Sequence, residues 1–202
     1  MPDLTLEKSL WQRGIRRVAG IDEVGRGSWA GPLMAAAVIL PRNFQIPQDF
    51  ADSKQVKPQA RLRFYRYIQK HASAVAIAQI PVSQINKKGI SNASQVAFRK
   101  AVKSLNPRPD YILIDAFYIK HLSRKNQLAI VKGDEKSVSI AAASIIAKVE
   151  RDRLMRQLAK KYPQYRFGKH KGYGTSLHQE LIKANGFSKI HRTSFNLKFL
   201  SS

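Results

Sequence analysis

The chain has 202 residues, which is long enough for one sizeable domain with its own hydrophobic core. Hydrophobic residues make up 44% of it and charged residues 24%, a composition that excludes a largely disordered chain. It contains no cysteine, which excludes disulfides and thiolate-bound zinc. Residues 1–17 lack the apolar core of a signal peptide and no apolar run is long enough to span a bilayer, so we expect a soluble, cytoplasmic protein without a membrane partner.

The strongest compositional feature is positive charge. Lys and Arg number 36 against 13 Asp and Glu, which gives a formal net charge of +23. Self-repulsion of this size disfavours the compact state, and a polyanionic partner would offset it. Basic residues are spread over the whole chain and no stretch resembles an amphipathic membrane anchor, which favours nucleic acid as the partner. A merely solvated basic surface is the alternative on charge alone.

Five segments in the first half of the chain have the patterns of regular elements. Residues 18–22 are apolar and stop before a Gly-Arg-Gly turn, which predicts a strand. Residues 33–40 are apolar throughout, as in a strand that is buried on both faces. Apolar side chains at helical spacing over residues 58–71 predict a helix, and an apolar run at residues 74–82 predicts a third strand. Helical spacing over residues 92–105 predicts a second helix.

The second half of the chain predicts two more strands and two more helices. Residues 111–114 and 127–131 are apolar runs of strand length. Residues 139–160 are rich in alanine and then basic, as in a long helix whose first half is buried. Thr175 is placed to cap a last helix over residues 176–185.

This order of elements predicts an α/β architecture. Three strands in close succession, followed by strands that alternate with helices, indicate a mixed five-stranded sheet flanked by helices. We divide the chain into a domain over residues 1–160 and a C-terminal helical segment over residues 161–202. We expect that segment to pack on the domain.

The few carboxylates of this basic chain gather at strand ends. Asp22 and Glu23 end the first predicted strand, Asp115 ends the fourth, and Asp134 follows the fifth. Binding sites form at strand ends in α/β sheets, and a cluster of carboxylates persists where a cation neutralises it. Carboxylate oxygens suit Mg²⁺ or Mn²⁺, and two such cations stabilise the attacking and leaving oxygens in phosphodiester hydrolysis. Each residue, taken singly, could instead be a solvated loop residue or a helix cap.

A series of motifs follows in a fixed order along the chain. They are residues 20–27 (GIDEVGRG) with residues 30–32 (AGP), then Asp52-Ser53-Lys54, Ile114-Asp115, Lys132-Gly133-Asp134, residues 139–152 (SIAAASIIAKVERD), residues 170–175 (HKGYGT) and residues 191–195 (HRTSF). Together they resemble the motifs of ribonuclease HII, the bacterial type 2 ribonuclease H. Because they cover nearly the whole chain in order, the resemblance is far more specific than any single motif.

The resemblance implies a fold and an activity. The fold would be RNase H-like, and the protein would be an endonuclease that cleaves the RNA strand of RNA–DNA hybrids. It would also cut on the 5′ side of single ribonucleotides in duplex DNA, leaving 3′-hydroxyl and 5′-phosphate ends by two-metal-ion catalysis. By match to the motifs, Asp22, Glu23, Asp115 and Asp134 are the catalytic carboxylates and the ligands of Mn²⁺ or Mg²⁺. Glu135 beside Asp134 is a competing candidate, and we prefer Asp134 because Lys-Gly-Asp is the matched motif.

The resemblance also implies that residues 1–160 are the catalytic domain and that residues 161–202 contact the substrate, and it assigns residues to substrate binding. Gly25, Arg26 and Gly27 match the loop that senses the 2′-hydroxyl, the group that distinguishes RNA from DNA. Glycines allow the backbone to approach a sugar closely. Tyr173 matches a tyrosine that packs against the nucleotide after the ribonucleotide, and Lys54 is a candidate phosphate contact.

Other residues of the matched motifs have less specific interpretations. We expect Lys148 and Arg151 to be helix-surface or structural partners, and Asp152 to form an ion pair, with Arg156 four residues later as the candidate partner. His191 and Arg192 are either structural or phosphate-contacting. Ser28-Trp29 stands where the family more often has Pro-Leu, which would alter local packing. The histidines have no zinc-binding pattern.

Two other functions remain open at this point. One is an RNase H-like nuclease that acts on DNA junctions or ends, and the other is a basic nucleic-acid-binding protein without catalytic activity. Turnover that depends on a metal and on a 2′-hydroxyl would separate them from the expected activity. We expect the protein to act as a monomer.

Overall fold

The computed structural model describes residues 1–50 and 56–197. The Asp52-Ser53-Lys54 motif, and with it the predicted contact of Lys54, lies outside the described residues. Within the described ranges, no helix combines the length and apolar character needed to cross a membrane.

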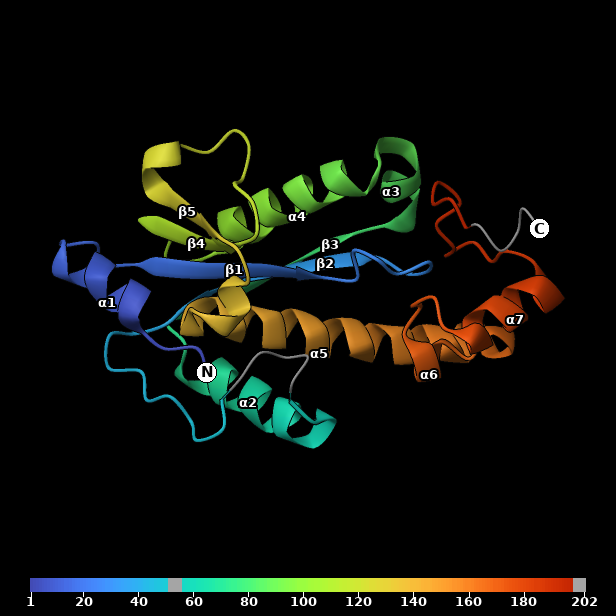
Figure 1. Ribbon diagram of the computed structural model, residues 1–202, viewed down its shortest axis with the longest axis horizontal. Helices are drawn as coiled ribbons and strands as arrows, with labels where there is room; N and C mark the ends of the chain where they lie inside the picture. Colours follow the sequence, from blue (N-terminus) through green and yellow to red (C-terminus); the bar gives the residue numbers. More distant parts are fainter. Residues whose placement is uncertain (51–55, 198–202) are drawn as a thin grey trace.

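A five-stranded sheet lies at the centre of the molecule, with helices on both of its faces (Figure 1). The strand order is β3-β2-β1-β4-β5. Strand β1 pairs antiparallel with β2 and parallel with β4, so the sheet is mixed, as predicted. The strands are β1 (Val18–Val24), β2 (Leu33–Ile39), β3 (Ala74–Ile80), β4 (Tyr111–Asp115) and β5 (Gln127–Ile130).

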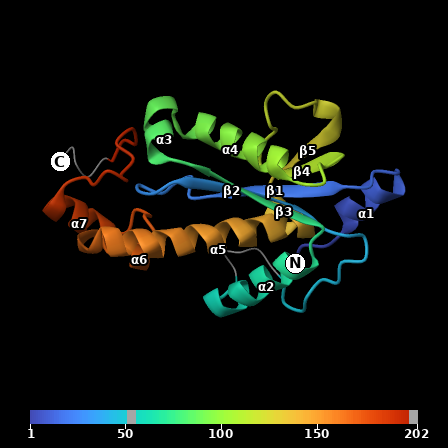
Figure 2. The ribbon, with the colours of Figure 1, turned by 180° about the vertical axis from the view of Figure 1, so that it is seen from behind.

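Helices cover the sheet in two layers. Helix α5 (Val138–Lys161) runs across β1 and β2 on one face, with α2 (Pro58–His71) packed beside it. Helix α4 (Ile90–Ser104) covers β2 and β3 on the other face, where Figure 2 shows it from behind. Each layer encloses its own cluster of buried apolar side chains.

Helix α5 approaches β1 unusually closely at Gly20. A Cβ atom on Gly20 would lie 2.0 Å from the backbone carbon of Ser139. Only glycine fits at this crossing, and the small residues of the alanine-rich half of α5 allow the helix to lie flat on the sheet.

The structure contains helices that the sequence did not predict. Helix α1 (Thr5–Gln12) begins without a hydrogen bond from the side chain of its N-cap residue, and α3 (Val82–Lys88) begins directly after Pro81, which is why β3 ends earlier than expected. The other short elements are α6 (Phe167–His170) and the 3₁₀ turns Arg124–Asn126, Gly133–Glu135 and Pro163–Tyr165. All are shorter than the windows in which helical periodicity is visible.

The C-terminal elements lie at the far end of α5 (Figure 1). Helix α7 (Ser176–Asn185) has the predicted bounds, and the Thr175 hydroxyl accepts a hydrogen bond from the backbone N–H of His178 at 3.3 Å. Tyr165 and Phe167 pack with Met155 of α5 in a third, smaller apolar cluster. The end of α5 therefore supports the segment that carries Tyr173.

Candidate metal centre and substrate loops

Three of the four predicted carboxylates converge. Asp22 lies in β1 and Asp115 ends the parallel neighbour β4, so both side chains reach the same edge of the sheet. Asp134 lies in the 3₁₀ turn Gly133–Glu135, after β5. One carboxylate oxygen from each of the three lies within 4.8 Å of the other two. Asp22 and Asp134 are buried and Asp115 is half-buried.

The turn that carries Asp134 is tied to Asp115. The backbone N–H of Gly133 donates a hydrogen bond to Oδ1 of Asp115 at 2.7 Å. A Cβ atom on Gly133 would lie 2.7 Å from Cδ1 of Ile140, so a larger residue would require the Ile140 side chain to shift. The Lys-Gly-Asp motif thus supplies one carboxylate of the cluster and the backbone N–H that binds another, Asp115.

The cluster has the electrostatic character of a cation site. Burial raises the pKa of Asp22 well above its ordinary value, and the charges of Glu23 and Asp115 raise it further. A hydrogen bond with Ser144 of α5 acts in the opposite direction. A bound cation would relieve this repulsion, and three carboxylates without histidine or cysteine suit Mg²⁺ or Mn²⁺.

Glu23 lies beside this group and not within it. Glu23 follows Asp22 in β1, and its charge is the largest of those that raise the pKa of Asp22, so the two carboxylates lie near one another. Its Oε1 lies 3.6 Å from Nη1 of Arg26. Glu135, the competing candidate for the fourth carboxylate, is exposed, and its Oε1 lies 3.5 Å from Nζ of Lys132. Asp134 is therefore the acidic residue of this turn that joins the cluster.

The glycine loop follows directly after the strand edge at which the carboxylates converge. Gly25 has a φ of +88°, and a Cβ atom there would lie 2.1 Å from Nε of Arg151. At Gly27, none of the described residues places an atom within 4 Å of the corresponding position, so its backbone is open to a ligand. The first glycine is required for packing, whereas the second leaves space.

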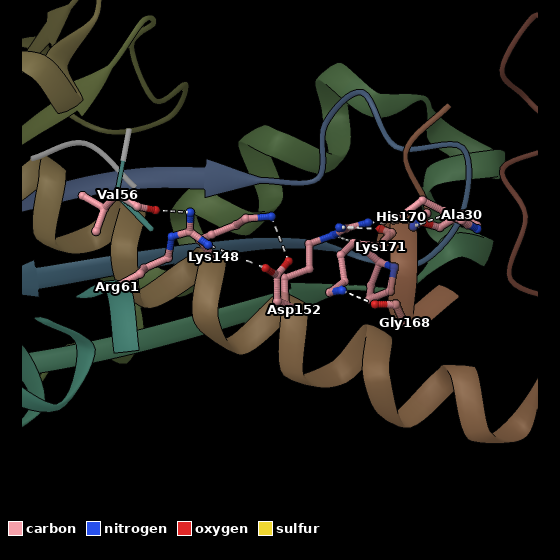
Figure 3. Close-up of polar contacts among 11 residues, drawn as sticks. Ala30, Val56, Arg61, Lys148, Asp152, Gly168, His170 and Lys171 are labelled. Atoms are coloured by element: carbon pink, nitrogen blue, oxygen red, sulfur yellow. Dashed lines mark hydrogen bonds and ion pairs between the residues drawn. The ribbon is translucent and has the colours of Figure 1, made fainter. Parts of the chain in front are cut away.

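Arg151 is buried and holds this loop. Its guanidinium donates to the carbonyl oxygens of Pro32 at 3.0 Å, Ala30 at 3.1 Å and Lys171 at 2.9 Å. Figure 3 shows Ala30 and Lys171 next to each other at this point. The expectation of a structural role is met, but Arg151 does not lie on the helix surface.

Arg192 is the second buried arginine at the loop. It donates to the carbonyl oxygen of Arg26 at 2.9 Å and to that of Gly31 at 2.9 and 3.0 Å. Arg192 was expected to be either structural or phosphate-contacting, and these hydrogen bonds show that it supports the backbone of the loop. The burial and the partners of these two arginines could not be predicted from sequence, because their acceptors are backbone atoms far away along the chain.

Tyr173 is half-buried and lies near two cations. Its ring centre is 5.5 Å from Nζ of Lys148 and 5.3 Å from the guanidinium carbon of Arg151. Trp29, the departure from the family pattern, packs beside it: a Cβ atom on Gly174 would lie 2.2 Å from the indole ring. The backbone N–H of Trp29 also donates to the carbonyl oxygen of Gly172 at 2.8 Å. The glycine loop and the tyrosine loop are therefore in direct contact.

Asp152 joins α5 to α2 (Figure 3). It accepts a hydrogen bond from Nζ of Lys148 at 2.8 Å and lies 4.0 Å from Nη1 of Arg61. Arg61 also donates to the carbonyl oxygen of Val56 at 2.7 Å. Asp152 is thus an ion-pair residue as predicted, although its partners among the described residues are Lys148 and Arg61, not Arg156.

Three histidines, His170, His178 and His191, form a buried cluster that was not predicted. His178 Nδ1 donates to the carbonyl oxygen of Tyr173 at 2.9 Å, which leaves its Nε2 to accept from Nε2 of His191 at 3.1 Å. The backbone N–H of Ser188 donates to Nδ1 of His191 at 2.8 Å. These bonds require both rings to be neutral, and burial lowers the pKa of each to about 4. The cluster therefore fixes the backbone of Tyr173.

Comparison with known proteins agrees with this geometry. The family model described as ribonuclease HII matches residues 19–198. A ribonuclease HII of Acetivibrio thermocellus is 48% identical over 194 residues, which are 96% of this chain and 75% of that protein.

Two solved structures have the same fold. The ribonuclease H2 of Pyrococcus horikoshii superposes with a TM-score of 0.74 at 26% identity, over 92% of this chain and 100% of that one. The RNase HII of Archaeoglobus fulgidus, solved in complex with PCNA, gives 0.76 at 26% identity, over 90% and 96% of the two chains. The fold is RNase H-like, and the chain belongs to the ribonuclease HII family of metal-dependent endonucleases.

Proposed function

We propose that this enzyme hydrolyses the RNA strand of RNA–DNA hybrids and cuts on the 5′ side of single ribonucleotides embedded in duplex DNA. The products would carry 3′-hydroxyl and 5′-phosphate ends. The observation that carries the proposal is the convergence of Asp22, Asp115 and Asp134 at the strand edge from which the glycine loop begins.

The four carboxylates form the metal centre in this proposal. Asp22, Glu23, Asp115 and Asp134 are the catalytic residues and hold Mg²⁺ or Mn²⁺, with Glu23 next to Asp22 in β1. Two bound cations supply charge stabilisation to the attacking and leaving oxygens of the phosphodiester. The hydrogen bond from Gly133 orients Asp115 and keeps the Asp134 turn against it.

Substrate selection is assigned to the two loops in contact. The open backbone at Gly27 allows a ribose to approach, and the loop of Gly25, Arg26 and Gly27 reads its 2′-hydroxyl. Tyr173, held by His178, packs against the following nucleotide. In this proposal residues 161–202 form the C-terminal segment that contacts the substrate, and the enzyme acts as a monomer.

Product mapping tests the proposal. Three duplexes of one sequence are incubated with Mg²⁺, Mn²⁺ or EDTA: all DNA, DNA with one ribonucleotide, and an RNA–DNA hybrid. We expect a single cut on the 5′ side of the ribonucleotide, several cuts in the hybrid, and none in EDTA. Cleavage of the all-DNA duplex would favour a junction or end nuclease, and binding without any cleavage would favour a non-catalytic protein.

A further inference from the structure

A second concave site lies next to the metal centre, on the α4 face of the sheet. It is a pocket of about 350 Å³ between the first turns of α4 and the loop that joins β4 to the turn Arg124–Asn126. Arg26 and Phe117 are among the residues that line it. They follow Glu23 and Asp115 closely in sequence, so the pocket adjoins the predicted cleavage site.

The pocket is lined by positively ionisable side chains. Arg26, Arg99, Lys120 and His121 face it, together with the polar side chains of Asn92 and Gln95, and none of the described residues that line it carries a carboxylate. Arg26 is paired with Glu23, which does not line the pocket, at 3.6 Å, and the other three groups have no carboxylate among the lining residues. This excess of positively ionisable groups favours an anionic ligand.

The loop on one side of the pocket is fixed before any ligand binds. Gln95 accepts a hydrogen bond from the backbone N–H of Lys120 at 2.7 Å and donates to the carbonyl oxygen of Tyr118 at 3.0 Å. Buried Gln127 holds the same loop from beneath, by exchanging hydrogen bonds with the backbone of Ile119 at 2.8 and 3.1 Å. His121 adopts a φ of +66°, a conformation that non-glycine residues rarely adopt. A site held in this way loses little entropy on binding.

Arg26 connects the pocket to the glycine loop. Its carbonyl oxygen accepts from Arg192, while its side chain lies over Phe117 at 5.0 Å and donates to Ser94 at 3.2 Å. The backbone and the side chain of Arg26 therefore contact different parts of the molecule. The backbone belongs to the loop that meets the ribose, and the guanidinium faces the pocket.

We propose that this pocket binds a backbone phosphate of the nucleic acid, one that is distinct from the scissile phosphate. Arg99 and Lys120 supply the charge, and Arg26 links the bound phosphate to the ribose-reading loop. Arginine guanidinium groups suit phosphate oxygens because they donate in a planar fork. The proposal rests on the proposed function, since it assigns a further contact to the same substrate.

The test is a methylphosphonate scan, in which each phosphate near a single ribonucleotide is replaced in turn by a neutral group. Binding is measured by fluorescence anisotropy in an Asp22→Asn background, so that the duplex stays intact. The pocket variant is Arg99→Gln/Lys120→Gln. Its matched control is Arg66→Gln/Lys70→Gln, which removes the same charge from the exposed face of α2, on the opposite side of the sheet.

We expect one or two adjacent methylphosphonates to weaken binding of the background protein and of the control about tenfold. In the pocket variant the same methylphosphonates should cause no further loss of binding affinity. The slope of log K for binding against log salt concentration should also become shallower in the pocket variant, by about one unit for each phosphate contact that is lost. This change in slope should be larger in the pocket variant than in the control. Identical scan profiles in the pocket variant and the control would overturn the proposal.

The result of the methylphosphonate scan can be distinguished from the result of the cleavage assay that tests the proposed function. If the wild-type enzyme cleaves none of the mapping substrates, the proposed function fails, whereas the scan still reports whether Arg99 and Lys120 bind a phosphate. If cleavage is normal and the scan is flat, only the pocket assignment fails.

Discussion

Arg192 donates a hydrogen bond through Nη1 to the carbonyl oxygen of Arg26 at 2.9 Å, across 166 residues of sequence. Its Nε and Nη2 both donate to the carbonyl oxygen of Gly31. The guanidinium is fully buried, and burial lowers its pKa to about 9. A residue near the C-terminus therefore fixes the backbone of the loop to which we assign ribose recognition.

Removing this contact should destabilise the protein. Arg192→Gln leaves the carbonyl oxygens of Arg26 and Gly31 without their donor, which should lower the free energy of unfolding by about 2–3 kcal/mol. Arg153→Gln is the control, because Arg153 forms an exposed pair with Glu150 and its removal should cost less than about 1 kcal/mol. Urea denaturation measures both, and equal decreases in the two variants would contradict the assigned role.

The histidine cluster predicts a dependence of stability on pH. His178 and His191 have a pKa of about 4 in the folded protein, against an ordinary value of about 6.5 in the unfolded chain. Between these pH values the unfolded chain binds protons that the folded protein does not. Above about pH 6.5 the two histidines should not affect the free energy of unfolding. Below that pH they should lower it, by up to about 3 kcal/mol for each histidine at pH 4.

Variants separate this effect from the titration of carboxylates. His191→Gln should flatten the fall in unfolding free energy between pH 6.5 and 4, as measured by urea titrations at several pH values. His71→Gln, at an exposed histidine of α2, should leave the profile unchanged. A His191→Gln profile as steep as that of the wild type would disprove the explanation.

Much of the architecture was predictable because its elements have strong local patterns. The run over β2 is buried at every residue, and α2 and α7 have the bounds that helical spacing and Thr175 predict. Asp22 and Asp115 could be placed together because parallel neighbouring strands end at one edge.

The supporting residues could not be predicted, for a physical reason. Arg151 and Arg192 donate to carbonyl groups, which every residue has, so no residue type marks their partners. The histidine cluster depends on a turn at residues 186–191 that returns the chain to α7. These contacts exist only after segments far apart along the chain have packed together.

Glu7 should stabilise the start of α5 from outside that helix. Its buried Oε1 accepts hydrogen bonds from the backbone N–H of Ser139 at 2.9 Å and from the hydroxyls of Ser137 and Ser139 at 2.6 Å. Glu7→Ala should lower the free energy of unfolding by about 2 kcal/mol, because these donors lose their acceptor. Thermal or urea unfolding measures the change. Glu180→Ala, at an exposed glutamate of α7, is the control, and a decrease of the same size there would exclude a specific role for Glu7.

Two glycines should respond differently to the same substitution. Gly20→Ala places a methyl group 2.0 Å from the backbone of α5, so the fold should be lost or destabilised by more than about 4 kcal/mol. Gly27→Ala meets no atom of the described residues within 4 Å and should fold normally. It should nevertheless lower kcat/KM on a single embedded ribonucleotide at least tenfold, because the methyl group occupies the open face of the loop. Full activity of Gly27→Ala would show that the ribose does not approach there.

The central claim is that Asp22, Asp115 and Asp134 hold a divalent cation, and calorimetric titration of Mn²⁺ into the metal-free protein tests it most directly. Asp110→Asn is the matched control, since Asp110 precedes β4 at the end opposite Asp115 and pairs with Arg17. We expect wild-type protein and this control to bind Mn²⁺ with the same affinity, and Asp22→Asn to bind at least about tenfold more weakly because a charged ligand is removed. Unchanged Mn²⁺ affinity in Asp22→Asn would contradict the claim.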